Sequence, residues 1–134
     1  MPLPLSRTSR ITQTMSDNSG LDEARRRGIT LGEVGQRIVL ENEHVRIWEV
    51  RLDPGQTIEF HIHYHPYIVI SLGGGANEIE TIFGNRIDIE EPLGSTVFIG
   101  DMRPVHRLTN RSTLTYLSRL IELKHVRWSA EQEQ

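Results

Sequence analysis

Nine short runs of β-forming residues, separated by turn residues, constrain the fold of this chain more than any other feature. The predicted strands cover residues 37–41, 45–52, 57–63, 68–72, 78–83, 86–90, 95–99, 105–109 and 113–123. The turns between them contain Gly, Pro or Asn, which supply the fixed or positive φ angles of tight turns. Short strands without a long helical pattern between them are typical of a β-sandwich or barrel.

The sequence divides into four parts, of which one contains the predicted strands. Residues 1–19 are rich in Ser, Thr, Pro and Arg, which predicts a disordered tail and leaves Met15 as an alternative start. Residues 20–36 are predicted to form a short helix and arm, because acidic residues come early, arginines come late and a glycine follows. Residues 37–124 form the predicted barrel, and residues 125–134 form a polar C-terminal tail.

Composition and charge argue against several classes of function. A length of 134 residues favours one domain. The net charge of −3 and the isoelectric point of about 6.1 do not suggest binding to nucleic acid or to an anionic membrane. The absence of cysteine excludes disulfides, a thiolate nucleophile and a zinc–cysteine site. No apolar run approaches the roughly 18 residues of a membrane helix, and no signal segment opens the chain, so we expect a cytoplasmic protein.

Two histidines one residue apart are the main functional signal. On an extended strand, His61 and His63 project from the same face of the sheet. A third histidine from another strand, His106, would complete a three-nitrogen face for a divalent metal ion and leave the opposite side open to water or substrate. The alternative is three ordinary structural histidines. His65 has the same parity, but Pro66 beside it predicts a bend that places His65 at the rim.

The sequence around these histidines resembles the first motif of the cupin superfamily, a set of small β-barrels of the jelly-roll type. That motif contains Gly, five residues, His-x-His, three or four residues, Glu, six residues and Gly. This sequence has Gly55, His61, His63, Tyr67 and Gly74 at these spacings. Every spacing matches, but a tyrosine replaces the usual glutamate ligand.

The second cupin motif is matched in part. It contains Gly, five residues, Pro-x-Gly, two residues, His, three residues and Asn. Gly94 opens the match, and His106 and Asn110 close it. Gly100 and Met102 stand where Pro and Gly are usual, and one extra residue precedes the histidine.

The resemblance covers residues 37–124 and implies an all-β, cupin-type jelly-roll β-barrel whose metal ligands are His61, His63 and His106. It also implies that three-histidine cupins are often dioxygenases acting on thiols, diketones or aromatic rings. Three neutral imidazoles do not cancel the charge of the ion, so the ion is a stronger Lewis acid than beside a carboxylate. Fe(II) is favoured, and Ni, Mn, Zn and Cu also bind imidazole.

Tyr67 and Glu59 are the candidate catalytic residues. Tyr67 occupies the vacated ligand position, where its phenol can hydrogen-bond a bound oxygen, donate a proton or ligate the metal; the alternative is an aromatic that fills the barrel mouth. Glu59 is expected on the same face as His61, either as the missing carboxylate or as an acceptor that orients the imidazole; the alternative is a solvated glutamate. Arg103 and Arg119 are candidate partners for a substrate carboxylate, with a plain surface charge as the alternative for each.

The parity of the same strand predicts an apolar outer face. If the histidines point into the barrel, then Ile58, Phe60 and Ile62 point out of it and need a cover. A second subunit is the expected cover, so we predict a homodimer. The N-terminal segment is the smaller alternative.

These signals predict a metal-binding cupin, most concretely a three-histidine Fe(II) dioxygenase that acts on a small chelating organic substrate. A metal-dependent lyase or isomerase would use the same ligands, and a non-catalytic cupin that binds a small molecule is a further alternative. A sugar-nucleotide epimerase-like barrel needs a His-Asp pair and a tyrosine, and the intact His-x-His spacing disfavours it.

Overall fold

The structure is a computed structural model that describes residues 18–129. The predicted disordered tail lies outside these residues except for Asn18 and Ser19, and residues 130–134 of the predicted C-terminal tail also lie outside them. Ser19 is buried, and its carbonyl accepts a hydrogen bond from the backbone N–H of Val105 at 2.7 Å. Ser19 therefore belongs to the packed arm and not to a free tail.

One short helix precedes nine strands in the described residues. They are α2 (Leu21–Arg26), β1 (Arg37–Glu41), β2 (Val45–Leu52), β3 (Thr57–His61), β4 (Tyr67–Gly73), β5 (Ala76–Thr81), β6 (Arg86–Glu90), β7 (Thr96–Ile99), β8 (His106–Asn110) and β9 (Tyr116–Leu123). The predicted strands are confirmed, with shifted ends. No helix in this part of the chain is long and apolar enough to cross a membrane.

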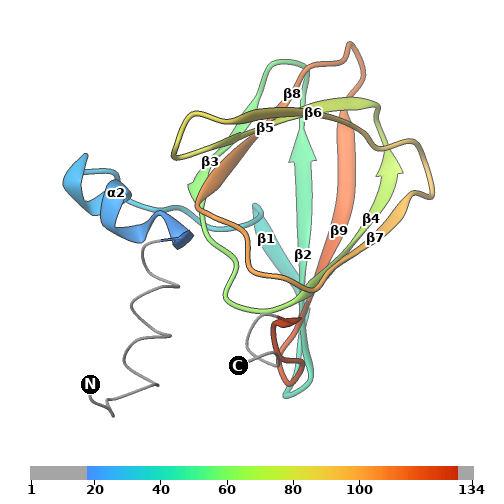
Figure 1. Cartoon of the computed structure of the whole chain (residues 1–134). Helices are drawn as coiled ribbons and strands as arrows, with labels where there is room; N and C mark the ends of the chain where they lie inside the picture. The colour runs from blue at the N-terminus through green and yellow to red at the C-terminus, as the bar shows by residue number, and fades with distance from the viewer. Residues whose placement is uncertain (1–17, 130–134) are drawn as a thin grey trace.

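Two antiparallel sheets face each other and enclose the interior, as Figure 1 shows. One sheet has the strand order β1-β2-β9-β4-β7, and the other has the order β3-β8-β5-β6. Alternate residues of β9 point inward, so that Tyr116, Ser118, Leu120 and Glu122 are buried. The fold is therefore the all-β jelly-roll barrel that the sequence predicted.

A β-bulge in β3 changes which residues of this strand face inward. The pairing with β8 shifts between Ile58 and His61, so that two residues of β3 stand opposite one residue of β8. Ile58 and His61 consequently both point inward and line the same cavity. The prediction that Ile58 faces outward is wrong, because strict alternation does not hold across the bulge.

The outer side of β3 is covered by the N-terminal arm. Phe60 and Ile62 are 7% and 4% exposed, and they belong to one apolar cluster with Ala24 of α2. The backbone N–H of Gly32 donates a hydrogen bond of 2.8 Å to the carbonyl of Phe60, which fastens the arm to the strand. The smaller alternative is therefore the observed cover, and this face does not require a second subunit. The homodimer stays a prediction.

The arm begins with the helix that its charges predicted. Asp22 and Glu23 lie in the first turn of α2 and pair with Arg25 at 2.9 Å and Arg26 at 2.6 Å. Gly20 precedes the helix with φ of +84°, and a Cβ atom there would collide with Cγ2 of Ile82. A glycine is needed at this point because the arm lies directly against the barrel.

Candidate metal centre

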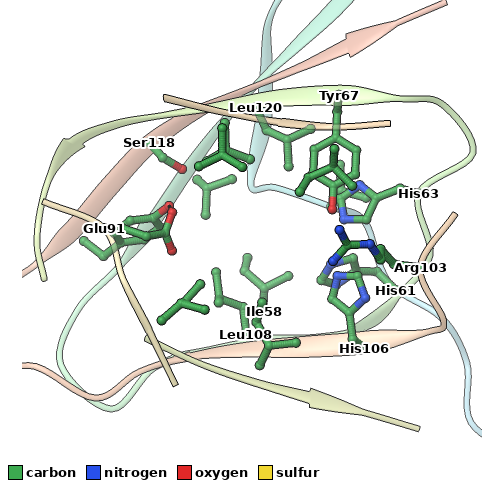
Figure 2. Close-up of a pocket in the computed structure, with 18 of the residues that line it drawn as sticks. Ile58, His61, His63, Tyr67, Glu91, Arg103, His106, Leu108, Ser118 and Leu120 are labelled. Atoms are coloured by element: carbon green, nitrogen blue, oxygen red, sulfur yellow. Dashed lines mark hydrogen bonds between the residues drawn. The ribbon is translucent and has the colours of Figure 1, made fainter. Parts of the chain in front are cut away.

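Three histidines meet inside the barrel at one end of its interior. His61 ends β3, His106 begins β8 and stands opposite it, and His63 follows two residues after the end of β3. Their side chains offer one nitrogen each, and these three atoms lie within 4.8 Å of one another. The residues are only 3%, 8% and 3% exposed, respectively. Figure 2 shows the three rings on the same side of the pocket. The convergence of distant segments that the sequence predicted is confirmed.

Backbone carbonyls hold two of the rings in the orientation that a metal requires. Nδ1 of His61 lies 2.8 Å from the carbonyl oxygen of Glu59, and Nδ1 of His106 lies 2.7 Å from that of Pro104. Because a carbonyl only accepts, each Nδ1 carries the proton and each Nε2 keeps its lone pair. Nδ1 of His63 is buried and has no hydrogen-bond partner among residues 18–129. This donor set fits a divalent ion of the type that imidazole binds.

Burial favours the neutral form of all three rings. It lowers the pKa of His61 to about 4, and the neighbouring His106 adds to this effect. Burial likewise lowers the pKa of His63 well below its usual value. Burial is the main cause that lowers the pKa of His106, while its bond to the Pro104 carbonyl opposes the shift. Neutral imidazole is the form that binds metal, so the cluster is ready to bind at neutral pH.

Tyr67 lies beside the cluster, where the family motif usually has its glutamate. Its ring stacks on that of His63, with centroids 3.9 Å apart and planes 18° apart. The residue is 6% exposed, and burial raises the pKa of its phenol above the usual range. The hydroxyl has no hydrogen-bond partner in the part of the chain that the structure describes. The group at this position is therefore a neutral phenol with a free donor.

The structure places the Glu59 side chain away from the cluster. It is 70% exposed, and its carboxylate lies 3.6 Å from the guanidinium of Arg107 on the outer surface. The bulge turns this side chain outward although it precedes His61 by two residues. The expectation that its carboxylate shares the histidine face is wrong. Glu59 orients the ring of His61 through its backbone carbonyl instead.

Of the three other residues that the sequence singled out as site candidates, one lines the pocket and two do not. Arg103 lines the pocket, and Figure 2 shows its guanidinium beside the imidazoles; it also pairs with Asp101 at 3.3 Å. Arg119 lies outside the pocket and pairs with Glu49 of β2 at 3.4 Å. His65 lines a separate surface pocket and does not join the cluster. Of the two arginines, only Arg103 lines the pocket that contains the histidines.

The histidines form one end of a cavity of about 390 Å³, a volume typical of small-molecule sites. Its walls are mostly apolar and include Ile58, Leu108 and Leu120. Glu91 and Ser118 lie at the opposite end, as Figure 2 shows. Sequence reasoning missed these two polar residues. The period of β9 places Ser118 inward, whereas Glu91 lies in a Glu-Glu-Pro turn that reads as exposed.

This chain is similar to known proteins in its structure, as three solved structures show. No protein-family model and no curated protein matches the sequence. A cupin domain from Bordetella pertussis Tohama I is similar in structure, with a TM-score of 0.61, 24% sequence identity, and coverage of 71% of this chain and 99% of that chain.

Two further solved structures are similar. A protein with a double-stranded β-helix domain from Klebsiella pneumoniae MGH 78578 has a TM-score of 0.52 and 20% identity, covering 75% of this chain and 88% of its own. A cupin superfamily protein from Desulfitobacterium hafniense DCB-2 has a TM-score of 0.50 and 13% identity, with 70% and 80% covered. The fold and the site thus define a small β-barrel with a buried histidine triad. This chain has the fold of the cupin superfamily.

Proposed function

We propose that this chain is a metal-dependent enzyme, most concretely an Fe(II) dioxygenase that acts on a small chelating organic substrate. The observation that carries the proposal is the set of three buried imidazoles, whose ligand nitrogens lie within 4.8 Å at one end of a cavity of about 390 Å³. His61, His63 and His106 would hold the ion from one side. When bound, Fe(II) would supply the redox chemistry by which dioxygen oxidises the substrate.

The residues around the cluster have separate tasks in this proposal. Arg103 attracts an anionic substrate towards the imidazoles, because its guanidinium lines the same end of the cavity. The phenol of Tyr67 donates a hydrogen bond or a proton to a substrate oxygen, since its hydroxyl has no partner among residues 18–129 and remains protonated. The apolar walls exclude water and strengthen both interactions.

Metal analysis combined with oxygen uptake tests this proposal. The protein is purified anaerobically from its native host, its metal content is measured, and oxygen consumption is followed with added diketones, thiols and hydroxy acids. Iron together with oxygen consumption supports the dioxygenase. Zinc or nickel together with turnover that consumes no oxygen favours the lyase or isomerase. Failure of the purified protein to bind Fe(II), Co(II), Ni(II) or Zn(II) contradicts a metal enzyme of any kind.

A further inference from the structure

We propose that Glu91 binds a cationic group of the substrate, so that the substrate is a two-ended molecule with a chelating, anionic head, an apolar middle and a protonated amine. Glu91 faces the histidines across the cavity (Figure 2). The inference of a chelating head group rests on the proposed function of the metal centre. The inference of an amine rests on the surroundings of Glu91 alone.

Glu91 is held firmly in a buried position. It is 9% exposed, and its backbone is fixed on both sides. Its N–H donates to the carbonyl of Gly75 at 2.8 Å, and its own carbonyl accepts from the hydroxyl of Ser71 at 2.8 Å. The carboxylate accepts one hydrogen bond on each oxygen, from the hydroxyl of Tyr116 at 2.7 Å and from the amide of Asn77 at 2.8 Å. A carboxylate has about four acceptor positions, so two remain for a ligand.

The charge of Glu91 has no counter-ion among the residues that the structure describes. Both donors are neutral, and no Lys, Arg or His nitrogen of residues 18–129 lies within 4.0 Å of its carboxylate. Glu122, another carboxylate buried inside the barrel, differs: Arg46 lies 3.6 Å away and Trp48 donates to it at 2.7 Å. A buried carboxylate without a cation is unfavourable unless something supplies the missing charge. A protonated amine has the required charge and donors.

The cavity separates this negative end from a positive one. Arg103 and the proposed metal ion lie at the histidine end, so an anionic head fits there. The apolar walls between the two ends suit an aliphatic spacer. The ligand class that matches all three parts is an ω-amino acid or a closely related aliphatic amine with a chelating acidic group.

Calorimetry on metal-free protein tests the amine end independently of any metal. The probes are hexylammonium and 1-hexanol, which share an aliphatic chain and differ in charge. We expect wild-type protein to bind hexylammonium about tenfold or more tighter than 1-hexanol. Glu91→Gln should abolish this preference. The control Asp88→Asn removes an exposed negative charge from the neighbouring strand and should retain it.

Equal affinities of the wild-type protein for the two probes would overturn the inference, and this comparison needs no variant. A preference that survives in Glu91→Gln would overturn it as well. The glutamine keeps an acceptor and adds an amide donor beside Asn77, whose Oδ1 has no partner within residues 18–129, so the fold should tolerate it; thermal melts check this.

The complete ligand class is tested on Co(II)-loaded protein with 6-aminohexanoate and hexanoate. Glu91→Gln should weaken only the amino acid, by about tenfold or more, and should leave Co(II) affinity unchanged. An equal effect on both probes contradicts the two-ended ligand. If Co(II) does not bind even to wild-type protein, the proposed function fails, while the hexylammonium comparison still decides the role of Glu91.

Discussion

Replacing Phe60 by alanine should destabilise the protein strongly and independently of its concentration. The side chain is 7% exposed in the cluster beneath the arm, and the guanidinium of Arg107 lies 4.6 Å from the centre of its ring. Removing a buried phenylalanine side chain costs about 3–5 kcal/mol, and the lost cation–π contact adds about 0.5–1 kcal/mol. A domain of this size has about 5–15 kcal/mol in total, so Phe60→Ala should lose a large share of it.

Urea unfolding at two protein concentrations measures this effect. The matched control is Phe83→Ala, because Phe83 is 52% exposed and should lose no more than about 1 kcal/mol. Since the arm of the same chain covers Phe60, the loss should be the same at low and high concentration. A loss that grows on dilution would refute this reasoning, because it would mean that a second subunit supplies the cover.

Four further predictions concern the site and the assembly. His106→Ala should weaken Co(II) or Zn(II) binding more than about 100-fold in competition titrations, whereas the exposed His44→Ala should not. Tyr67→Phe should retain metal binding but lower kcat by about 100-fold or more, and Glu59→Gln should leave both unchanged because its side chain lies on the surface. Burial lowers the pKa of His61 from 6.5 to about 4, so acidification from pH 6.5 to 4 protonates this ring mainly in the unfolded state. The metal-free protein should therefore lose up to about 3 kcal/mol through this ring over that range, and His61→Gln should lose correspondingly less in urea titrations at pH 7 and pH 4.5. Light scattering tests the predicted homodimer, which should give twice the chain mass; a single-chain mass at all concentrations would contradict it.

The strands and the histidine cluster were predictable from the sequence because both depend on local spacing. The period of two and the turn residues define the strands, and the His-x-His pattern with a later histidine defines the candidate ligands. The structure adds the pairing of β3 with β8, which places His61 opposite His106. Sequence spacing and strand pairing agree at this end of the barrel.

The errors and omissions have a different physical origin. The bulge that turns Ile58 inward and Glu59 outward contains neither glycine nor proline, and it becomes visible only through the pairing with β8. Glu91 stands between a glutamate and a proline, a context typical of an exposed turn. Its burial depends on Asn77 and Tyr116, which lie 14 and 25 residues away in the chain. Long-range partners of this kind leave no local pattern.

The alternation of residues at the end of β3 links the arm to the metal centre. Phe60 and Ile62 lie under the arm, while the residues that follow each of them, His61 and His63, point into the cavity. Packing on the outer side therefore fixes the positions of two candidate ligands on the inner side. Loosening the arm with Phe60→Ala should weaken metal binding, and bound metal should restore part of the lost stability, because the two effects are thermodynamically linked.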